Sequence, residues 1–190
     1  KSETDVAWIE GGKKLAFLCD GQLFTENPDG TDRKQVSESK TDIEGFRFSP
    51  DGKKVILIKS LPYYGSIKQN PSDLPKATGM VITDLNYRHW DHYVTTILHP
   101  FVANVSANGM IDEGKDILAG ENYECPTAPF GGIEQLAWSV DSRSVAYTCR
   151  KKEGVDYATS TDTDIFLYDL ETGKTRNLCK TGVSLPKSDP

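Results

Sequence analysis

The densest group of side chains that could recognise a ligand lies in one short segment, residues 87–93, which reads YRHWDHY. The planar guanidinium of Arg88 could bind a carbonyl or carboxylate group of a peptide. Trp90 and Tyr93 could form the walls of a pocket for a peptide side chain. These three residues are the predicted substrate contacts.

A structural role is the alternative interpretation of the same segment. In that case the segment is an extended hairpin held in place by its aromatic rings. Arg88 would then stack on Trp90, or form an ion pair with Asp84 or Asp91.

The histidines of this region raise the question of a metal site. The zinc pattern expected of a hydrolase is HExxH on a helix, and His89, His92 and His99 do not form it. On a continuous strand, His89 and Asp91 would share a face while His92 pointed the other way. We therefore predict no metal site and no cofactor.

Four cysteines offer a second kind of chemistry: Cys19, Cys125, Cys149 and Cys179. None forms a CxxC pair, which argues against a structural zinc site. Cys19 and Cys149 each end an apolar run, where a thiol packs as a small hydrophobe. Free buried thiols are the favoured interpretation. One disulfide stays open as the alternative, so the cysteines do not identify the redox compartment.

The elements that position these residues belong to an internal repeat. Three segments share an apolar strand ending in an aromatic residue, then a polar turn, then a second apolar strand. A tight hairpin suits this pattern because glycine accepts a positive φ and aspartate caps its own turn. We expect Asp51 and Asp141 to have this capping role. The three segments are 5–20, 45–60 and 135–150, with Trp8, Phe48 and Trp138 as their aromatic residues.

The second half of each repeat also matches, in segments 22–36, 100–118 and 164–178. Each copy thus has four short antiparallel strands in about 40 residues, which is one blade of a β-propeller. A β-sandwich would also have many short strands, but its architecture does not require the same aromatic-turn-apolar sequence pattern to occur three times. The predicted fold class is all-β, a partial β-propeller of about three four-stranded antiparallel blades.

The spacing of the repeats locates an insertion. Trp8 and Phe48 are 40 residues apart, whereas Phe48 and Trp138 are 90 apart, so the second blade carries about 50 extra residues. A smaller extension is expected at 119–132. Within one partial propeller domain, 1–190, the predicted blades are about 5–40, about 42–120 with the insertion at 60–98, and about 131–181.

Composition excludes several classes of function. A net charge of −6, with scattered lysines and arginines, does not suggest a nucleic-acid partner. No stretch approaches the ~20 apolar residues that span a bilayer, and the first residues, KSETDVAW, are not a signal peptide. Three blades cannot close a ring, so we expect further blades and predict self-association through the exposed blade faces.

Several phrases carry a resemblance to known proteins. FSPDGKKV (48–55) and WSVDSRSV (138–145) look like the TolB/WD40-like propeller repeat. Two longer phrases, 83–105 and 123–142, together with DIFLYDLETGKTRNL (164–178), resemble the N-terminal propeller of prolyl-oligopeptidase-family serine peptidases. Among these, the bacterial dipeptidyl aminopeptidases of dipeptidyl-peptidase IV or V type are the most similar branch.

The resemblance implies a propeller that caps an α/β-hydrolase domain and selects short peptides for a Ser-Asp-His triad. The implied partners are a peptide substrate, further blades and the hydrolase domain, and the implied location is periplasmic or secreted. No GxSxG occurs in the sequence, so we predict no catalytic residue and expect the catalytic domain to be absent. No Glu-Glu pair occurs either, so the glutamate pair that binds the substrate amine in the dipeptidyl-peptidase IV branch lies outside this sequence or is absent, as in the V-type branch.

A binding propeller of TolB type, which serves as a scaffold for other proteins, is the alternative function. A glycan-binding or glycosidase propeller is a third interpretation. It would need two carboxylates placed about 5–10 Å apart, and the sequence offers no such pair that can be located.

Overall fold

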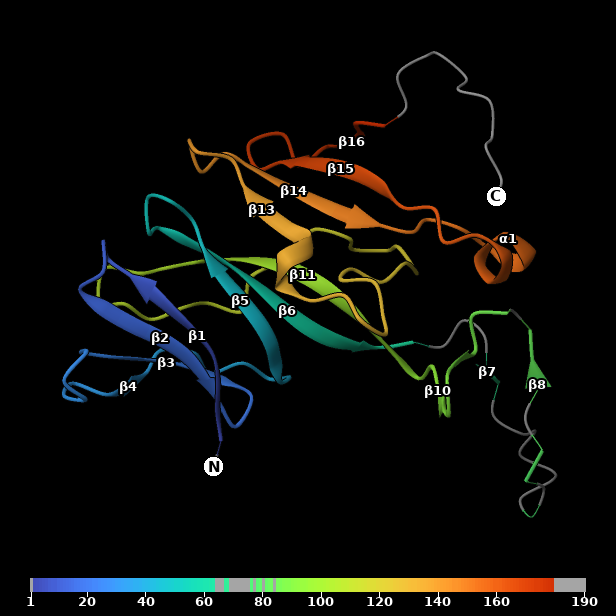
Figure 1. The fold of residues 1–190 in the computed structure, drawn as a ribbon, viewed down its shortest axis with the longest axis horizontal. Helices are drawn as coiled ribbons and strands as arrows, with labels where there is room; N and C mark the ends of the chain where they lie inside the picture. Colours follow the sequence, from blue (N-terminus) through green and yellow to red (C-terminus); the bar gives the residue numbers. More distant parts are fainter. Residues whose placement is uncertain are drawn as a thin grey trace.

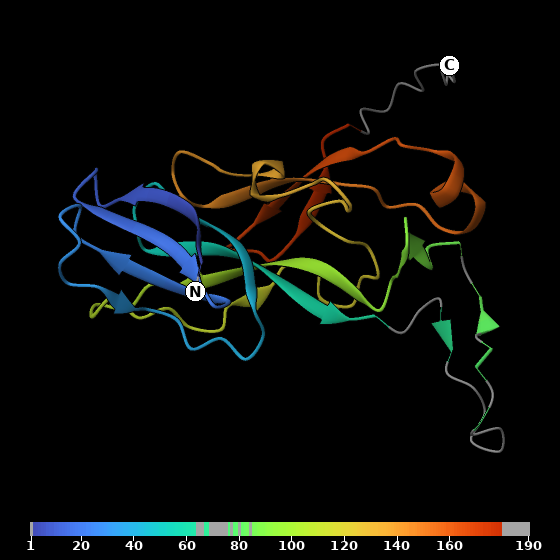
Figure 2. The same cartoon turned by 60° about the horizontal axis from the view of Figure 1, so that its bottom comes forward.

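A computed structural model describes residues 2–63, 67–68, 76, 78–79, 81–83 and 85–179. Three four-stranded antiparallel sheets dominate it, and in each the strands follow chain order. Figures 1 and 2 show the three sheets side by side. The all-β fold class and the partial propeller are therefore confirmed.

The strands of each sheet have these bounds. The first sheet contains β1 (Glu3–Ile9), β2 (Lys14–Cys19), β3 (Gln22–Glu26) and β4 (Lys34–Gln35). The second contains β5 (Ile43–Phe48), β6 (Lys54–Pro62), β11 (Thr96–Asn104) and β12 (Lys115–Asp116). The third contains β13 (Leu136–Trp138), β14 (Ser144–Cys149), β15 (Asp164–Asp169) and β16 (Thr175–Asn177).

The hairpin turns that open the second and third sheets are built alike. The Asp51 carboxylate accepts hydrogen bonds from Ser49 Oγ at 2.7 Å and from the Lys53 amide at 3.1 Å. Asp141 accepts equivalent bonds from Ser139 Oγ at 2.6 Å and the Arg143 amide at 3.1 Å. The predicted capping role of both aspartates is confirmed.

The residue after each of these aspartates has a positive φ, +70° at Gly52 and +60° at Ser142. A side chain is disfavoured there. Ser142 has a compensating contact, since its hydroxyl accepts a 3.2 Å hydrogen bond from the Asp51 amide of the neighbouring turn.

The core lies between the sheets, and the second sheet is apolar on both faces. Along β6, Val55 and Leu57 pack against residues of the first sheet, whereas Ile56 and Ile58 pack against the third. Successive side chains of a strand point to opposite faces, so a continuous apolar run suits a strand that is covered on both sides.

Hydrogen bonds between sheets supplement this packing. Trp138 Nε1 donates to the Arg47 carbonyl at 2.9 Å, and the Arg47 guanidinium donates to the Leu136 carbonyl. These bonds join β13 to β5, the first strands of two neighbouring sheets.

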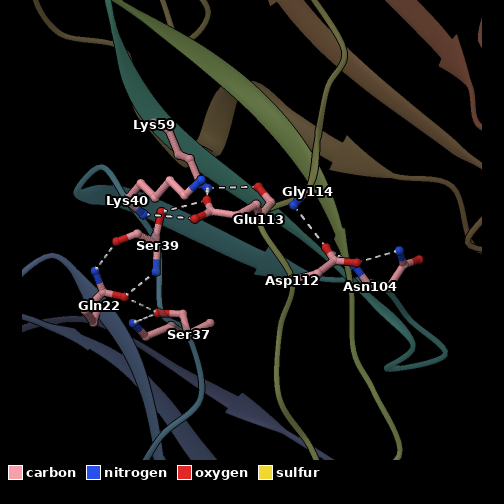
Figure 3. A network of polar contacts seen from close by, with 10 residues as sticks. Gln22, Ser37, Ser39, Lys40, Lys59, Asn104, Asp112, Glu113 and Gly114 are labelled. Atoms are coloured by element: carbon pink, nitrogen blue, oxygen red, sulfur yellow. Dashed lines mark hydrogen bonds and ion pairs between the residues drawn. The ribbon is translucent and has the colours of Figure 1, made fainter.

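A polar network joins the first sheet to the second (Figure 3). Lys59 is only 2% exposed, and its ammonium donates to Glu113 Oε2 at 2.6 Å and to the Glu113 carbonyl at 2.8 Å. The same carboxylate accepts from the Lys40 amide and the Ser39 hydroxyl, while Gln22 Oε1 accepts from the Ser39 amide. Pairing is what allows a buried ammonium to remain charged.

The insertion leaves the second sheet after β6 and returns at β11. It contains two ladders, one of β7 (Ile67–Lys68) with β8 (Val81–Ile82), the other of β9 (Arg88–His89) with β10 (His92–Tyr93). A short helix, α1 (Gly154–Thr159), follows β14 and lies at the same end of the molecule as the insertion (Figures 1 and 2).

Two short helical turns, α1 and η1 (Ile133–Gln135), were not anticipated from the sequence. Both are too brief to show an apolar stripe of period 3.6. Across the described ranges, no helix has the length and apolar character needed to cross a bilayer.

Candidate functional site

The three predicted contact residues lie on the hairpin of β9 and β10. Arg88 pairs with Tyr93 across this hairpin, and His89 pairs with His92. Cross-strand partners point to the same face. The exposed side chains of Arg88 and Tyr93 therefore lie together on one face, and the two histidines lie on the other.

Trp90 occupies the tip of the hairpin, where its φ is +50°. Trp90 is 71% exposed, and its indole packs edge-on against the Phe130 ring, with centroids 5.1 Å apart. Phe130 is itself 79% exposed and belongs to the predicted extension at 119–132. The tip therefore presents two aromatic rings, from two distant segments, to solvent.

The specific contacts proposed for a purely structural hairpin are absent in the described part of the chain. Arg88 neither stacks on Trp90 nor pairs with Asp91 there, because the Asp91 carboxylate bonds His92 Nδ1 at 2.5 Å. Asp84 lies outside the described residues.

The other face of the hairpin is fixed by a buried carboxylate. Glu124 is 6% exposed, and its Oε1 bonds both His89 Nε2 at 3.0 Å and the Tyr157 hydroxyl at 2.9 Å. The Arg150 guanidinium lies 4.1 Å from the centre of the Tyr157 ring. Burial raises the pKa of Tyr157, so this phenol stays protonated and donates to Glu124.

Further contacts tie the extension to the segment around α1. The Tyr123 hydroxyl donates to Glu153 at 2.7 Å, and this bond raises the pKa of Tyr123 to about 12. Lys151 pairs with Glu121 and lies 4.5 Å from the Phe166 ring centre. Two segments, the extension and the segment around α1, therefore support the hairpin and its exposed tip.

The expected strand geometry of the histidines is wrong. The chain turns at Trp90 and Asp91, so His89 and His92 face each other across a hairpin and share a side. Each of the three histidines is bonded to a different carboxylate, with His99 Nδ1 on Asp116 at 2.9 Å. In the described ranges, no three His, Cys, Asp or Glu side chains are grouped so as to hold a metal ion.

A groove of about 750 Å³ lies at the opposite end of the first and second sheets. It is formed by the turns that join β1 to β2 and β5 to β6, and by the loop after β11. Arg88, Trp90 and Tyr93 do not line it. These three residues of the hairpin are exposed and lie away from this groove.

Sequence reasoning missed Phe130, Glu124 and Tyr157. Phe130 had a weak signal, since it is a large apolar residue directly before Gly131 and Gly132 in a loop. Glu124 and Tyr157 had none, because their partners lie far away in the chain.

Comparison with solved structures identifies the class of fold. The chain superposes on part of the acylaminoacyl peptidase of Pyrococcus horikoshii with a TM-score of 0.57 and 13% identity, covering 93% of this chain and 25% of that one. No family model matches the chain. The chain is thus a segment of β-propeller that shares the fold of part of this peptidase structure.

Similarity in sequence indicates the kind of protein more specifically than similarity in fold does. The chain is 47% identical over 176 residues to Dipeptidyl-peptidase 5 of Porphyromonas gingivalis and 42% identical over 175 residues to Dipeptidyl-peptidase 5 of Porphyromonas endodontalis. Each match covers 90% of this chain but only about a quarter of the relative, 26% and 25%. The resemblance to the dipeptidyl aminopeptidases is confirmed: the chain is a propeller segment related to proteins of that kind.

Proposed function

We propose that the chain is the substrate-gating, non-catalytic part of a serine-type dipeptidyl peptidase that cleaves short peptides. The observation that carries this proposal is the exposed tip of the β9–β10 hairpin, in a chain 47% identical to a dipeptidyl peptidase. Such a peptidase would act in the periplasm or outside the cell. Its remaining blades and a hydrolase domain would be partners of this chain.

The hairpin is suited to contact an extended peptide. Arg88 offers a planar donor for peptide carbonyl or carboxylate oxygens, and Trp90 with Phe130 offers an apolar surface for a side chain. Buried Glu124 holds the hairpin in position, so the hairpin loses little conformational entropy when a peptide binds. A rigid blade that carries such an element narrows the approach to a reaction centre lying elsewhere.

The first prediction tests the contact role in the full-length peptidase. We expect Arg88→Ala and Trp90→Ala each to lower kcat/KM for a peptide substrate by roughly tenfold, which corresponds to about 1.4 kcal/mol of lost transition-state binding. Lys53→Ala is the matched control, because Lys53 is an exposed cation in the β5–β6 turn, at the end of the second sheet opposite the insertion. Unchanged kcat/KM in both variants would contradict a contact role for the hairpin.

The second prediction concerns the chain of 190 residues by itself. We expect it not to hydrolyse a chromogenic dipeptidyl substrate, because its proposed role is to gate rather than to cleave. The measurement is release of the chromophore with and without a serine-directed inhibitor. Turnover that the inhibitor abolishes would show that the chain holds its own nucleophile.

A further inference from the structure

Two buried thiols meet where the extension at 119–132 packs on the third sheet. Cys125 Sγ lies 3.3 Å from the Thr148 carbonyl oxygen, and Cys149 Sγ lies 3.4 Å from the Glu124 carbonyl oxygen. Each sulfur therefore contacts the residue directly before the other cysteine. Both are free thiols in this structure and have no measurable exposure.

This reciprocal contact places the two cysteines next to each other in the same core cluster. A carbonyl oxygen lies about 3 Å from the Cα of the following residue, so each sulfur is close to the backbone of the other cysteine. A disulfide requires Cα atoms roughly 4.4–6.8 Å apart. The Cys125 amide also donates to the Leu98 carbonyl at 2.8 Å, which fixes this part of the extension against β11.

We propose that Cys125 and Cys149 form a disulfide when the chain folds under oxidising conditions, and that this bond staples the extension to the third sheet. In the reaction both S–H bonds break and one S–S bond forms. The oxidant is a low-molecular-weight disulfide or a disulfide-exchanging oxidoreductase: its own S–S bond breaks, and its two sulfurs take up the two electrons and two protons as thiols. A mixed disulfide with the oxidant is the intermediate.

The burial of the two thiols determines the stage of folding at which the disulfide can form. Desolvation raises the pKa of Cys149 to about 12 and also raises that of Cys125, so neither is a thiolate at neutral pH in the folded chain. The bond must therefore form before the core closes. Once formed, it is shielded from reducing agents until the chain unfolds.

The staple would lie directly beside Glu124, the carboxylate that holds the β9–β10 hairpin. It would therefore fix the loop that carries both Glu124 and Phe130. This inference stands on the thiol geometry alone and does not depend on the proposed peptidase function.

The experiment is refolding of the full chain in a mixture of oxidised and reduced glutathione. The product is denatured, alkylated and analysed by mass spectrometry with peptide mapping. We expect two of the four cysteines to resist alkylation and one cross-linked peptide pair to contain Cys125 and Cys149. Compared with chain refolded in reducing buffer, the oxidised chain should have a Tm higher by roughly 5–10 °C.

Two variants make the result specific. Cys19→Ser with Cys179→Ser should keep the cross-link, whereas Cys125→Ala should lose it and leave no protected pair. Alkylation of all four cysteines in the oxidatively refolded chain would overturn the proposal. So would a cross-link that contains Cys19 or Cys179.

Discussion

Glu124 joins three segments that are distant in sequence, and it does so with a single buried oxygen. Its partners His89 and Tyr157 lie 35 and 33 residues away. No local pattern could have predicted this residue. The capping of Asp51 was predictable, since its partners Ser49 and Lys53 each lie two residues away and the turn itself requires them.

The third prediction belongs to this residue. Glu124→Gln keeps the shape of the side chain but removes the charge that both donors approach. We expect the free energy of unfolding to fall by about 1–3 kcal/mol, because hydrogen bonds to a buried charged group are weakened. Urea denaturation followed by fluorescence measures this change.

Glu171→Gln is the control for that substitution. Glu171 is an exposed carboxylate paired with Arg143 at the surface, and such pairs contribute little. We expect its stability to change by less than about 0.5 kcal/mol. If Glu124→Gln also left the free energy of unfolding unchanged, the hairpin would have to be held by contacts other than those of this carboxylate.

Among the strands, those in the repeated hairpins were predicted well, and those in the insertion were not. The hairpin at Phe48 can be recognised from the sequence because its turn and its two apolar strands are adjacent in the chain. By contrast, β9 and β10 contain two residues each, which is too few to show an alternating pattern. The Trp90–Phe130 contact depends on how two loops meet, so only the assembled sheets reveal it.

The fourth prediction concerns the connection between the first and second sheets, and it depends on pH. The hydrogen bond from Lys59 is the main cause that lowers the pKa of Glu113 below its ordinary value of 4.5. The folded chain then binds a proton at this carboxylate less readily than the unfolded chain does. The stabilisation is present above about pH 4.5 and is lost as pH falls through the lower, folded value.

Glu113→Gln should therefore unfold more easily than the natural chain at pH 7, by roughly 1–2 kcal/mol, since half of the carboxylate is exposed and partly screened. The difference should narrow as pH falls below about 4. Thermal unfolding by circular dichroism from pH 7 to pH 3 measures it, with exposed Glu38→Gln as the control. A gap that stays constant with pH would show that the ion pair is not its source.

For the whole molecule, the position of a sheet decides how much of it is covered. The middle sheet is buried on both faces, whereas the first sheet has one covered face. Trp8 is 62% exposed, although its repeat partner Trp138 donates to the neighbouring Arg47 carbonyl. Val6 beside it is exposed as well. Val6 and Trp8 therefore expose apolar area on the first sheet.

The fifth prediction follows from this surface. We propose that the chain self-associates at high concentration, because an apolar face left in water favours contact with another copy. Light scattering as a function of concentration measures it, and Val6→Glu with Trp8→Glu should shift the chain toward monomer. Val140→Glu is the control, since Val140 is a single exposed residue in a turn. A monomer at every concentration would contradict the proposal.

The two-sided burial of β6 has a consequence for the nascent chain. Residues 55–58 read VILI, a short β-forming run of the kind that pairs with strands of other molecules when it is left uncovered. During synthesis this run emerges about eighty residues before the sheet that later covers its second face. Lys54 and Lys59 bracket it, and charges in these flanking positions discourage intermolecular pairing. Lys59 would thus act as a gatekeeper against aggregation before it ever reaches Glu113.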